Sequence, residues 1–253
     1  MINDILVSII TPSYNSSNWI EKTYLSLKEQ SHTNWEWLIT DDCSSDNTLQ
    51  IINKICVMDK RVKVFSNDVN SGAAVSRNNS LANSNGDFLA FVDSDDLWLS
   101  HKLEKQIKFM LENAVDFSFT SYELIDEKGE SLNQTVDSHD IKFVTYKDML
   151  RKKATLGCST VMIRKSAFDD ITMPLIRTGQ DYGLWLKLLK TGKNAFKFNQ
   201  VLTQYRILPN SISRNKFKKA KRQWQIYREI EKLSLLTALE CFTFYAYRAV
   251  FRK

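Results

Sequence analysis

Asp87-Phe88-Leu89-Ala90-Phe91-Val92-Asp93-Ser94-Asp95-Asp96 joins a short apolar run to three carboxylates. The apolar part predicts a buried strand over residues 87–92. In an open parallel α/β sheet, ligands bind in the crevice beyond the carboxyl ends of the strands. Closely spaced carboxylates repel one another there unless a cation lies between them, and oxygen ligands suit Mg²⁺ or Mn²⁺. The segment therefore favours a metal-bound phosphorylated substrate, with a polar turn before a helix from about residue 99 as an equal alternative.

The preceding residues alternate between strand and helix patterns. Strands are predicted over residues 5–10, 35–40, 62–65 and 87–92, and helices over 19–30, 46–58 and 73–82. Strands separated by single helices indicate right-handed crossovers and a parallel sheet in an α/β fold.

The pattern after Trp98 is less regular. It predicts helices over residues 103–111 and 182–190, strands over 117–125, 159–163 and 195–205, and a mobile polar loop over 131–142. Residues 1–98 and 99–213 thus form two halves of one expected domain, and residues 214–253 form a C-terminal tail.

Composition indicates an ordinary globular protein. The chain has 253 residues, of which 43% are hydrophobic and 25% charged. Its four cysteines are scattered without a CxxC pair, which favours reduced thiols in a cytosolic protein. The N-terminus does not resemble a signal peptide, and no apolar run reaches the ~18–20 residues of a spanning helix.

The net charge of +6 is concentrated in the tail. Residues 214–253 contain eleven Lys or Arg and three acids, a net charge of +8, which leaves −2 for the other 213 residues. Since the body is close to neutral, nucleic-acid binding by it has no electrostatic support.

Polar clusters follow three of the predicted parallel strands. Residues 11–15, Asp41-Asp42 and residues 93–96 would line one crevice. Tyr14 would offer a ring face to a base, and Asp42 would accept a hydrogen bond from an amide-like N–H. Each of the first two clusters has an equally good structural explanation when taken singly. Tyr14 could be a partly buried aromatic of a loop, and the segment from Asp41 to Asp46 could be a turn that caps the next helix.

Other nucleotide-binding loops are not found in this sequence. Residues 11–15 contain no glycine, so the dinucleotide fingerprint is absent, and there is no GxxxxGK[ST] loop. A metal is then the more plausible means of neutralising a diphosphate.

In the second half, Asp181 opens a predicted helix, where it would be either a cap or a general base that takes a proton from an acceptor hydroxyl.

Together these segments resemble the family 2 glycosyltransferases, which have the GT-A fold. The segments that carry the resemblance are Val7-Ser8-Ile9-Ile10-Thr11-Pro12-Ser13-Tyr14-Asn15, Asp41-Asp42-Cys43-Ser44-Ser45-Asp46-Asn47-Thr48, Asn70-Ser71-Gly72-Ala73-Ala74-Val75-Ser76-Arg77-Asn78, Phe91-Val92-Asp93-Ser94-Asp95-Asp96, Gln180-Asp181-Tyr182-Gly183-Leu184-Trp185-Leu186, and the closing segment Tyr205-Arg206-Ile207-Leu208-Pro209-Asn210-Ser211-Ile212-Ser213. The resemblance extends over about residues 5–213. It implies a mostly parallel sheet in an α/β/α sandwich, with residues 1–98 binding a nucleotide sugar and residues 99–213 an acceptor.

The resemblance also implies an inverting transferase with a UDP-sugar donor and Mn²⁺ or Mg²⁺. Carried over by motif, the nucleotide-sugar site consists of Pro12, Tyr14, Asp42, Ser71, Arg77, Asp93 and Ser94. The first three would hold the uracil, and Asp93 would lie at the ribose. Asp95, with Asp93, would bind the metal on the diphosphate, and Asp181 would be the base. Arg77 is equally well explained as a structural helix residue.

Three positions depart from the family pattern. Cys43 replaces a usual Gly, Gln180 a common Glu, and Leu208 a frequent His. None of these changes removes the expected metal ligand or base. The resemblance is strongest to bacterial transferases that build O-antigen, capsule or teichuronic-type repeats on lipid-diphosphate carriers, which implies a lipid-diphosphate-linked saccharide as acceptor.

The tail combines cations with apolar and aromatic residues. Residues 214–222 hold six Lys or Arg and no acid, and an apolar stretch follows over 233–251. Two interpretations are equally consistent with this pattern: a solvated basic helix followed by a helix packed on the body, and a tail that lies on the cytoplasmic membrane surface. The second alternative predicts a cytoplasmic protein peripherally associated with the inner leaflet.

Two other functions remain open from sequence. A nucleotidyltransferase would use metal carboxylates on a similar sheet, but it normally has a basic glycine-rich loop after its first strand. A non-catalytic nucleotide-sugar-binding protein or membrane-docked partner would not need Asp93, Asp95 and Asp181 together.

Overall fold

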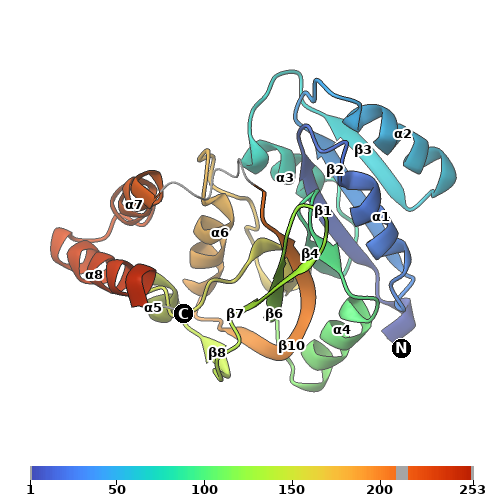
Figure 1. The fold of residues 1–253 in the computed structure, drawn as a ribbon. Helices are drawn as coiled ribbons and strands as arrows, with labels where there is room; N and C mark the ends of the chain where they lie inside the picture. The colour runs from blue at the N-terminus through green and yellow to red at the C-terminus, as the bar shows by residue number, and fades with distance from the viewer. Residues whose placement is uncertain (1, 209–215, 252–253) are drawn as a thin grey trace.

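The apolar run before the three carboxylates forms the strand β4 (Phe88–Phe91) at the middle of the sheet, and residues 93–96 follow it as the carboxylate loop. The computed structural model describes residues 2–208 and 216–251 (Figure 1). In the first half, β1 (Val7–Ser13), β2 (Trp35–Asp41), β3 (Val62–Ser66) and β4 are parallel, in the order β3-β2-β1-β4. This confirms the predicted parallel sheet.

The second half continues the same sheet. Its further strands are β5 (Leu97–Trp98), β6 (Phe117–Ile125), β7 (Ser131–Val136), β8 (Phe143–Val144), β9 (Met162–Arg164) and β10 (Ala195–Arg206). The order proceeds β4-β9-β6-β10-β5, with β9 antiparallel to both neighbours and β10 parallel to β6. One continuous sheet therefore connects the two halves, and β4 lies where they meet.

Helices cover both faces of the sheet. They are α1 (Ile20–Lys28), α2 (Thr48–Met58), α3 (Ala73–Ala82), α4 (Lys102–Glu112), α5 (Tyr146–Leu150) and α6 (Gln180–Leu189). Neighbouring residues of β1 point into separate cores: Ile9 packs with α1, α2 and α4, whereas Ile10 packs with α3 and α6. This is the alternation of a strand buried on both faces, and it confirms the α/β/α sandwich.

Two sequence-based expectations in the second half are wrong. Residues 131–136 form β7 instead of a mobile loop, because their backbone pairs antiparallel with β6 although most of their side chains are exposed. Residues 159–163 are not one strand: a 3₁₀ turn (Cys158–Thr160) precedes β9. That turn aims the Ser159 hydroxyl at the carboxylate loop, where it accepts from the Asp93 N–H at 3.0 Å and donates to Asp96 at 2.5 Å.

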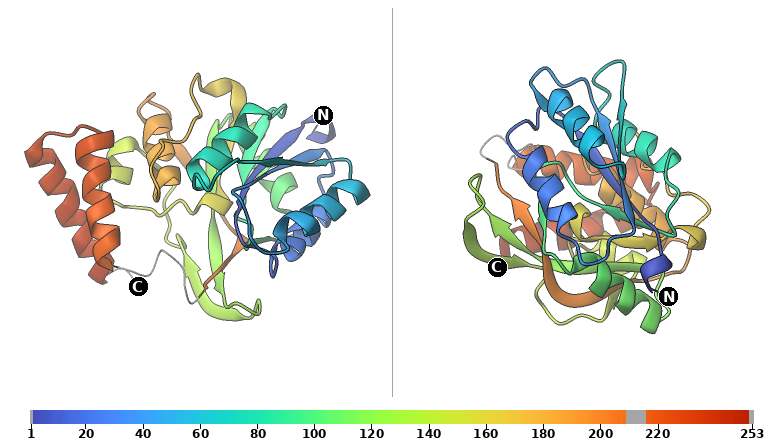
Figure 2. Two further views of the ribbon diagram at one scale, coloured as in Figure 1. Left: turned by 90° about the horizontal axis from the view of Figure 1, so that it is seen from above. Right: turned by 90° about the vertical axis from the view of Figure 1, so that its right-hand side faces the viewer.

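The tail packs on the body. It forms α7 (Lys216–Gln225), a π-helical turn (Ile226–Ile230) and α8 (Leu235–Phe251), at the end of the molecule away from α2 (Figures 1 and 2). Ile226, Tyr227 and Ala238 are buried in the core that contains α6. Among the helices in the described ranges, none has the length and apolar character needed to cross a membrane. Residues 209–213 of the closing segment, and residues 214 and 215 of the basic run, lie outside the described residues.

Candidate active site

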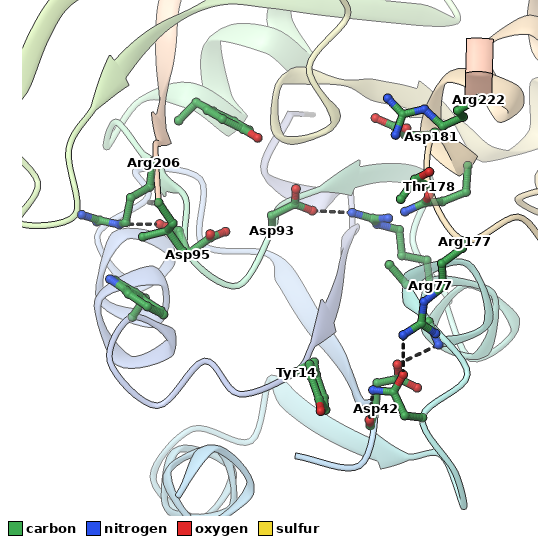
Figure 3. Close-up of a pocket in the computed structure, with 18 of the residues that line it drawn as sticks. Tyr14, Asp42, Arg77, Asp93, Asp95, Arg177, Thr178, Asp181, Arg206 and Arg222 are labelled. Atoms are coloured by element: carbon green, nitrogen blue, oxygen red, sulfur yellow. Dashed lines mark hydrogen bonds and ion pairs between the residues drawn. The ribbon is translucent and has the colours of Figure 1, made fainter. Parts of the chain in front are cut away.

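A pocket of about 850 Å³ opens at the carboxyl ends of β1, β2 and β4 (Figure 3). It is lined by the predicted site residues Tyr14, Asp42, Arg77, Asp93, Asp95 and Asp181. Pro12 and Ser94 line an adjoining cavity of about 350 Å³, which shares several of these residues. Ser71 lines neither cavity but bonds to Asp42. The structure therefore brings residues from both halves of the chain to one place.

Asp42 organises the loop before α3. Its carboxylate accepts the backbone N–H groups of Ser71 at 2.8 Å and Gly72 at 2.7 Å, and the Asn67 amide at 2.8 Å. Gly72 has a φ of 89°, a left-handed conformation that suits glycine. Because each carboxylate oxygen has two lone pairs, Asp42 keeps one acceptor position for a ligand. Tyr14 is 51% exposed at the pocket rim, so its ring face is open to a base.

The carboxylate loop contains one structural and two pocket-facing acids. Asp96 is fully buried and accepts from Ser159 and from the Arg206 N–H at 2.9 Å. Asp93 and Asp95 line the pocket (Figure 3). Burial, together with the nearby charge of Asp93, raises the pKa of Asp95 to about 7. The charge at this point is thus incompletely compensated by the protein.

Two carboxylates that face one pocket fit a divalent cation. Among the described residues, no group of three or more His, Cys, Asp or Glu is placed to hold a metal. Asp93 and Asp95 would therefore supply only part of the ligand set. This suits Mg²⁺ and Mn²⁺, which usually keep waters and share phosphate oxygens of a substrate.

Arg77 lies beneath this loop on α3. Its side chain is 5% exposed and forms an ion pair with Asp93. Its Nε and Nη1 atoms have no hydrogen-bond partner within residues 2–208 and 216–251. A buried guanidinium with unused N–H groups beside a pocket is suited to an anionic ligand. Through its ion pair, Arg77 also positions the Asp93 carboxylate.

Asp181 lies in the first turn of α6, on the far side of the pocket from Asp95 (Figure 3). The helix begins after Gly179, which has a φ of 76°. Within the described part of the chain, no hydrogen bond to the Asp181 carboxylate is found, so its oxygens are available to a substrate hydroxyl. The neighbouring Gln180 side chain is buried, and its Oε1 has no partner there either.

Three pocket arginines were not singled out from sequence. Arg177 donates to Asn70 at 2.8 Å, and Arg206 donates to the Asp95 carbonyl at 2.8 Å. Arg222, from α7, packs over Gly179, where an added Cβ would lie 3.1 Å from its Cδ. Of these, Arg206 stands in the closing segment that carries the family resemblance. Arg177 and Arg222 belong to no local motif and reach the pocket only through folding.

The sequence matches the profile of glycosyl transferase family 2 over residues 8–172. Over 245 residues it is 47% identical to TuaG of Bacillus subtilis strain 168, a glycosyltransferase named for teichuronic acid biosynthesis, covering 97% of this chain and 96% of TuaG. It is 38% identical over 226 residues to WfgD of Escherichia coli, named as a UDP-Glc:alpha-D-GlcNAc-diphosphoundecaprenol beta-1,3-glucosyltransferase, covering 89% of this chain and 86% of WfgD.

Solved structures share the fold. The S. aureus TarS fragment 1–349 in complex with UDP-GlcNAc has a TM-score of 0.76 at 22% identity, covering 98% of this chain and 73% of that fragment. The mannosyltransferase PcManGT of Pyrobaculum calidifontis, in complex with GDP-Man and Mn²⁺, has a TM-score of 0.70 at 15% identity, covering 97% of this chain and 70% of PcManGT. These likenesses confirm the GT-A fold that the sequence resemblance implied.

Proposed function

Because the chain belongs to glycosyl transferase family 2, we propose that it moves a hexosyl or N-acetylhexosaminyl unit, with inversion, from a UDP-sugar to a lipid-diphosphate-linked sugar. The reaction would serve surface polysaccharide synthesis, as the names of its relatives indicate. The observation that carries the proposal is that Asp93, Asp95 and Asp181 face one pocket from two separate segments.

The donor would bind at the β1–β4 edge. Pro12, Tyr14 and Asp42 would hold the uracil, and Ser71, Ser94, Arg77 and Asp93 would line the rest of the nucleotide site. Asp95, with Asp93, would hold Mn²⁺ or Mg²⁺. The bound cation would offset negative charge that develops on the departing UDP. The unused acceptor position of Asp42 supports the uracil contact.

Asp181 would be the general base. Its free carboxylate would take the proton of the acceptor hydroxyl as that oxygen bonds to the anomeric carbon. The bond from that carbon to the diphosphate would break at the same time, with the electron pair leaving on UDP. A single displacement from the opposite side inverts the configuration, unlike a two-step route through a covalent intermediate.

The tail would place the enzyme at the inner leaflet of the cytoplasmic membrane. Leu235, Leu236 and Leu239 on α8 are between 46% and 80% exposed, and the basic helix α7 lies beside α8. Exposed leucines next to cations suit an interface of acyl chains and anionic headgroups. The acceptor of WfgD, by its name, is lipid-linked, which is consistent with work at such a surface.

The donor proposal is tested by calorimetric titration of UDP into the protein with and without Mn²⁺. Binding is expected only with the metal and should be lost in Asp95→Ala, because half of the protein's metal ligands are then removed. Asp169→Ala, an exposed acid outside both cavities, is the matched control. Equal binding by wild type and Asp95→Ala would overturn the metal assignment.

The base is tested separately with Asp181→Asn. This change keeps the shape of the side chain but removes its ability to take a proton. Turnover with a UDP-sugar and a lipid-diphosphate acceptor should fall about 10²–10⁴-fold, while UDP affinity stays the same. Unchanged turnover would show that another group is the base.

A further inference from the structure

A third cavity adjoins the candidate active site on the side of the tail. It measures about 280 Å³ and is lined by residues of α7, of α8 and of the segment 152–155, among them Lys152, Lys219, Arg222 and Arg248. Four of these described lining residues are cations and none is an acid. The volume is several times the ~30 Å³ share of one water molecule, so the cavity can admit a phosphate group.

The cations of this cavity repel one another. Burial and the charge of Arg222 both lower the pKa of Lys219. The described residues offer Arg222 no hydrogen bond or ion pair, whereas Lys152 lies over the Tyr182 ring at 3.3 Å and Arg248 donates to the Lys152 carbonyl at 3.0 Å. Lys219 and Arg222 are thus two close charges that an anion would stabilise.

Arg222 connects this cavity to the main pocket, because it lines both. It packs on Gly179, two residues before Asp181, and lies on the same side of the pocket as Asp181 (Figure 3). In an acceptor whose sugar is attached to a lipid diphosphate, one sugar ring separates the attacked hydroxyl from the nearer phosphate. The phosphate of such an acceptor would therefore come close to Arg222 when the hydroxyl is at Asp181.

We propose that the cavity between α7, α8 and residues 152–155 binds the diphosphate of the acceptor lipid, with Lys219 and Arg222 as its principal ligands. This inference rests on the proposed function, whose acceptor class it explains. The donor diphosphate is assigned to Asp93 and Asp95, so the molecule would hold its two diphosphates at separate places. The exposed leucines of α8 lie on the same helix pair, where the lipid chain would leave the protein.

The test is binding of a water-soluble acceptor, α-GlcNAc-diphosphate with a short isoprenoid chain, compared with the matching phosphate-free glycoside. Wild type should prefer the diphosphate. Arg222→Gln and Lys219→Gln should each weaken its binding about tenfold, the effect of one lost charged contact, without weakening the glycoside. Lys221→Gln, an exposed cation on the same helix, is the matched control. Unchanged melting temperatures establish that the variants are folded.

Three outcomes overturn the inference. The first is equal affinity of the wild type for both acceptors, and the second is unchanged acceptor binding in both variants. The third is that the variants lose only their binding to phosphatidylglycerol vesicles without acceptor, which would identify the cavity as a headgroup site. UDP titration with Mn²⁺ on the same samples reports the donor site independently. Absent UDP binding with intact diphosphate preference would reject the proposed donor but retain this inference.

Discussion

At the scale of single residues, Ser159 decides where the carboxylate loop lies. Its hydroxyl is buried, accepts from the Asp93 backbone N–H and donates to Asp96. Asp96 in turn accepts from the Arg206 N–H at the end of β10. A chain of hydrogen bonds through four residues thus fixes the loop after β4 relative to the second half of the sheet. The geometry of Asp93 depends on it.

Ser159→Ala is expected to remove both bonds and leave a buried N–H and a carboxylate oxygen without partners. Stability should fall by about 1–3 kcal/mol, measured by urea unfolding. Metal-dependent UDP affinity should also fall, because Asp93 loses its anchor. Ser131→Ala, which removes an exposed hydroxyl that bonds to Glu123, should cost much less. Equal stability losses in the two variants would contradict the role of Ser159 in this hydrogen-bond chain.

At the scale of elements, α8 has two different sides. Ala238 and Cys241 are buried against the body, whereas Leu236 is 80% and Leu239 46% exposed. The buried side belongs to the hydrophobic cluster that also contains residues of α5 and α6. The exposed side leaves apolar area in solvent that a bilayer surface would cover.

The double change Leu236→Glu, Leu239→Glu should reduce binding to vesicles that contain phosphatidylglycerol, measured by co-sedimentation. Each leucine loses favourable burial, and each new carboxylate is repelled by anionic lipid. The fold should be unaffected because both side chains face away from the core. Leu175→Glu, at an exposed leucine far from the tail in sequence, is the control. Undiminished vesicle binding in the double variant would argue against this face.

At the scale of the whole molecule, one buried lysine makes stability depend on pH. Lys102, at the start of α4, is fully buried; it donates to Gln106 at 2.6 Å and to the Thr160 carbonyl at 3.3 Å, and lies over the Trp98 ring. Burial lowers the pKa of Lys102 to about 7. In the unfolded chain its pKa returns to its ordinary value near 10.5.

Between pH 7 and pH 10 the unfolded chain therefore holds a proton on Lys102 that the folded protein lacks. The contribution of Lys102 to the free energy of unfolding should therefore rise with pH across this window, because the unfolded chain binds this proton and the folded protein does not. Lys102→Met should show a smaller rise, measured as the free energy of unfolding in urea from pH 7 to pH 9.5. Parallel curves for the two proteins would show that Lys102 is charged in the fold throughout.

Much of the fold was predictable because the central strands are buried on both faces. Such strands appear as short apolar runs, and the carboxylates that follow them are visible at once. By contrast, β7 has a polar sequence, and its pairing with β6 leaves no local pattern. Ser159 was predicted within a strand. Its contacts are with residues more than sixty positions away in the chain, so no local pattern marks its role.

The pocket acids that follow β2 and β4 were predictable for the same reason, but the pocket arginines were not. Arg177 and Arg222 reach the pocket through contacts with Asn70 and Gly179, which lie 107 residues and about 40 residues away in the chain, respectively. No spacing rule connects such positions. The basic run that contains Arg222 was instead interpreted as a solvated helix or a membrane contact, and its contribution to the pocket emerged only from the packing of α7.

The burial of Tyr227 has a consequence for where the chain tolerates interruption. This tyrosine is fully enclosed, and its hydroxyl donates to the Leu150 carbonyl, while Glu231 forms an ion pair with Lys190 at 2.6 Å. A stop codon between β10 and α7 would remove these contacts and uncover the apolar side of α5 and α6. The shortened product should aggregate instead of remaining a folded catalytic module, so α7 and α8 belong to the same folding unit as the sheet.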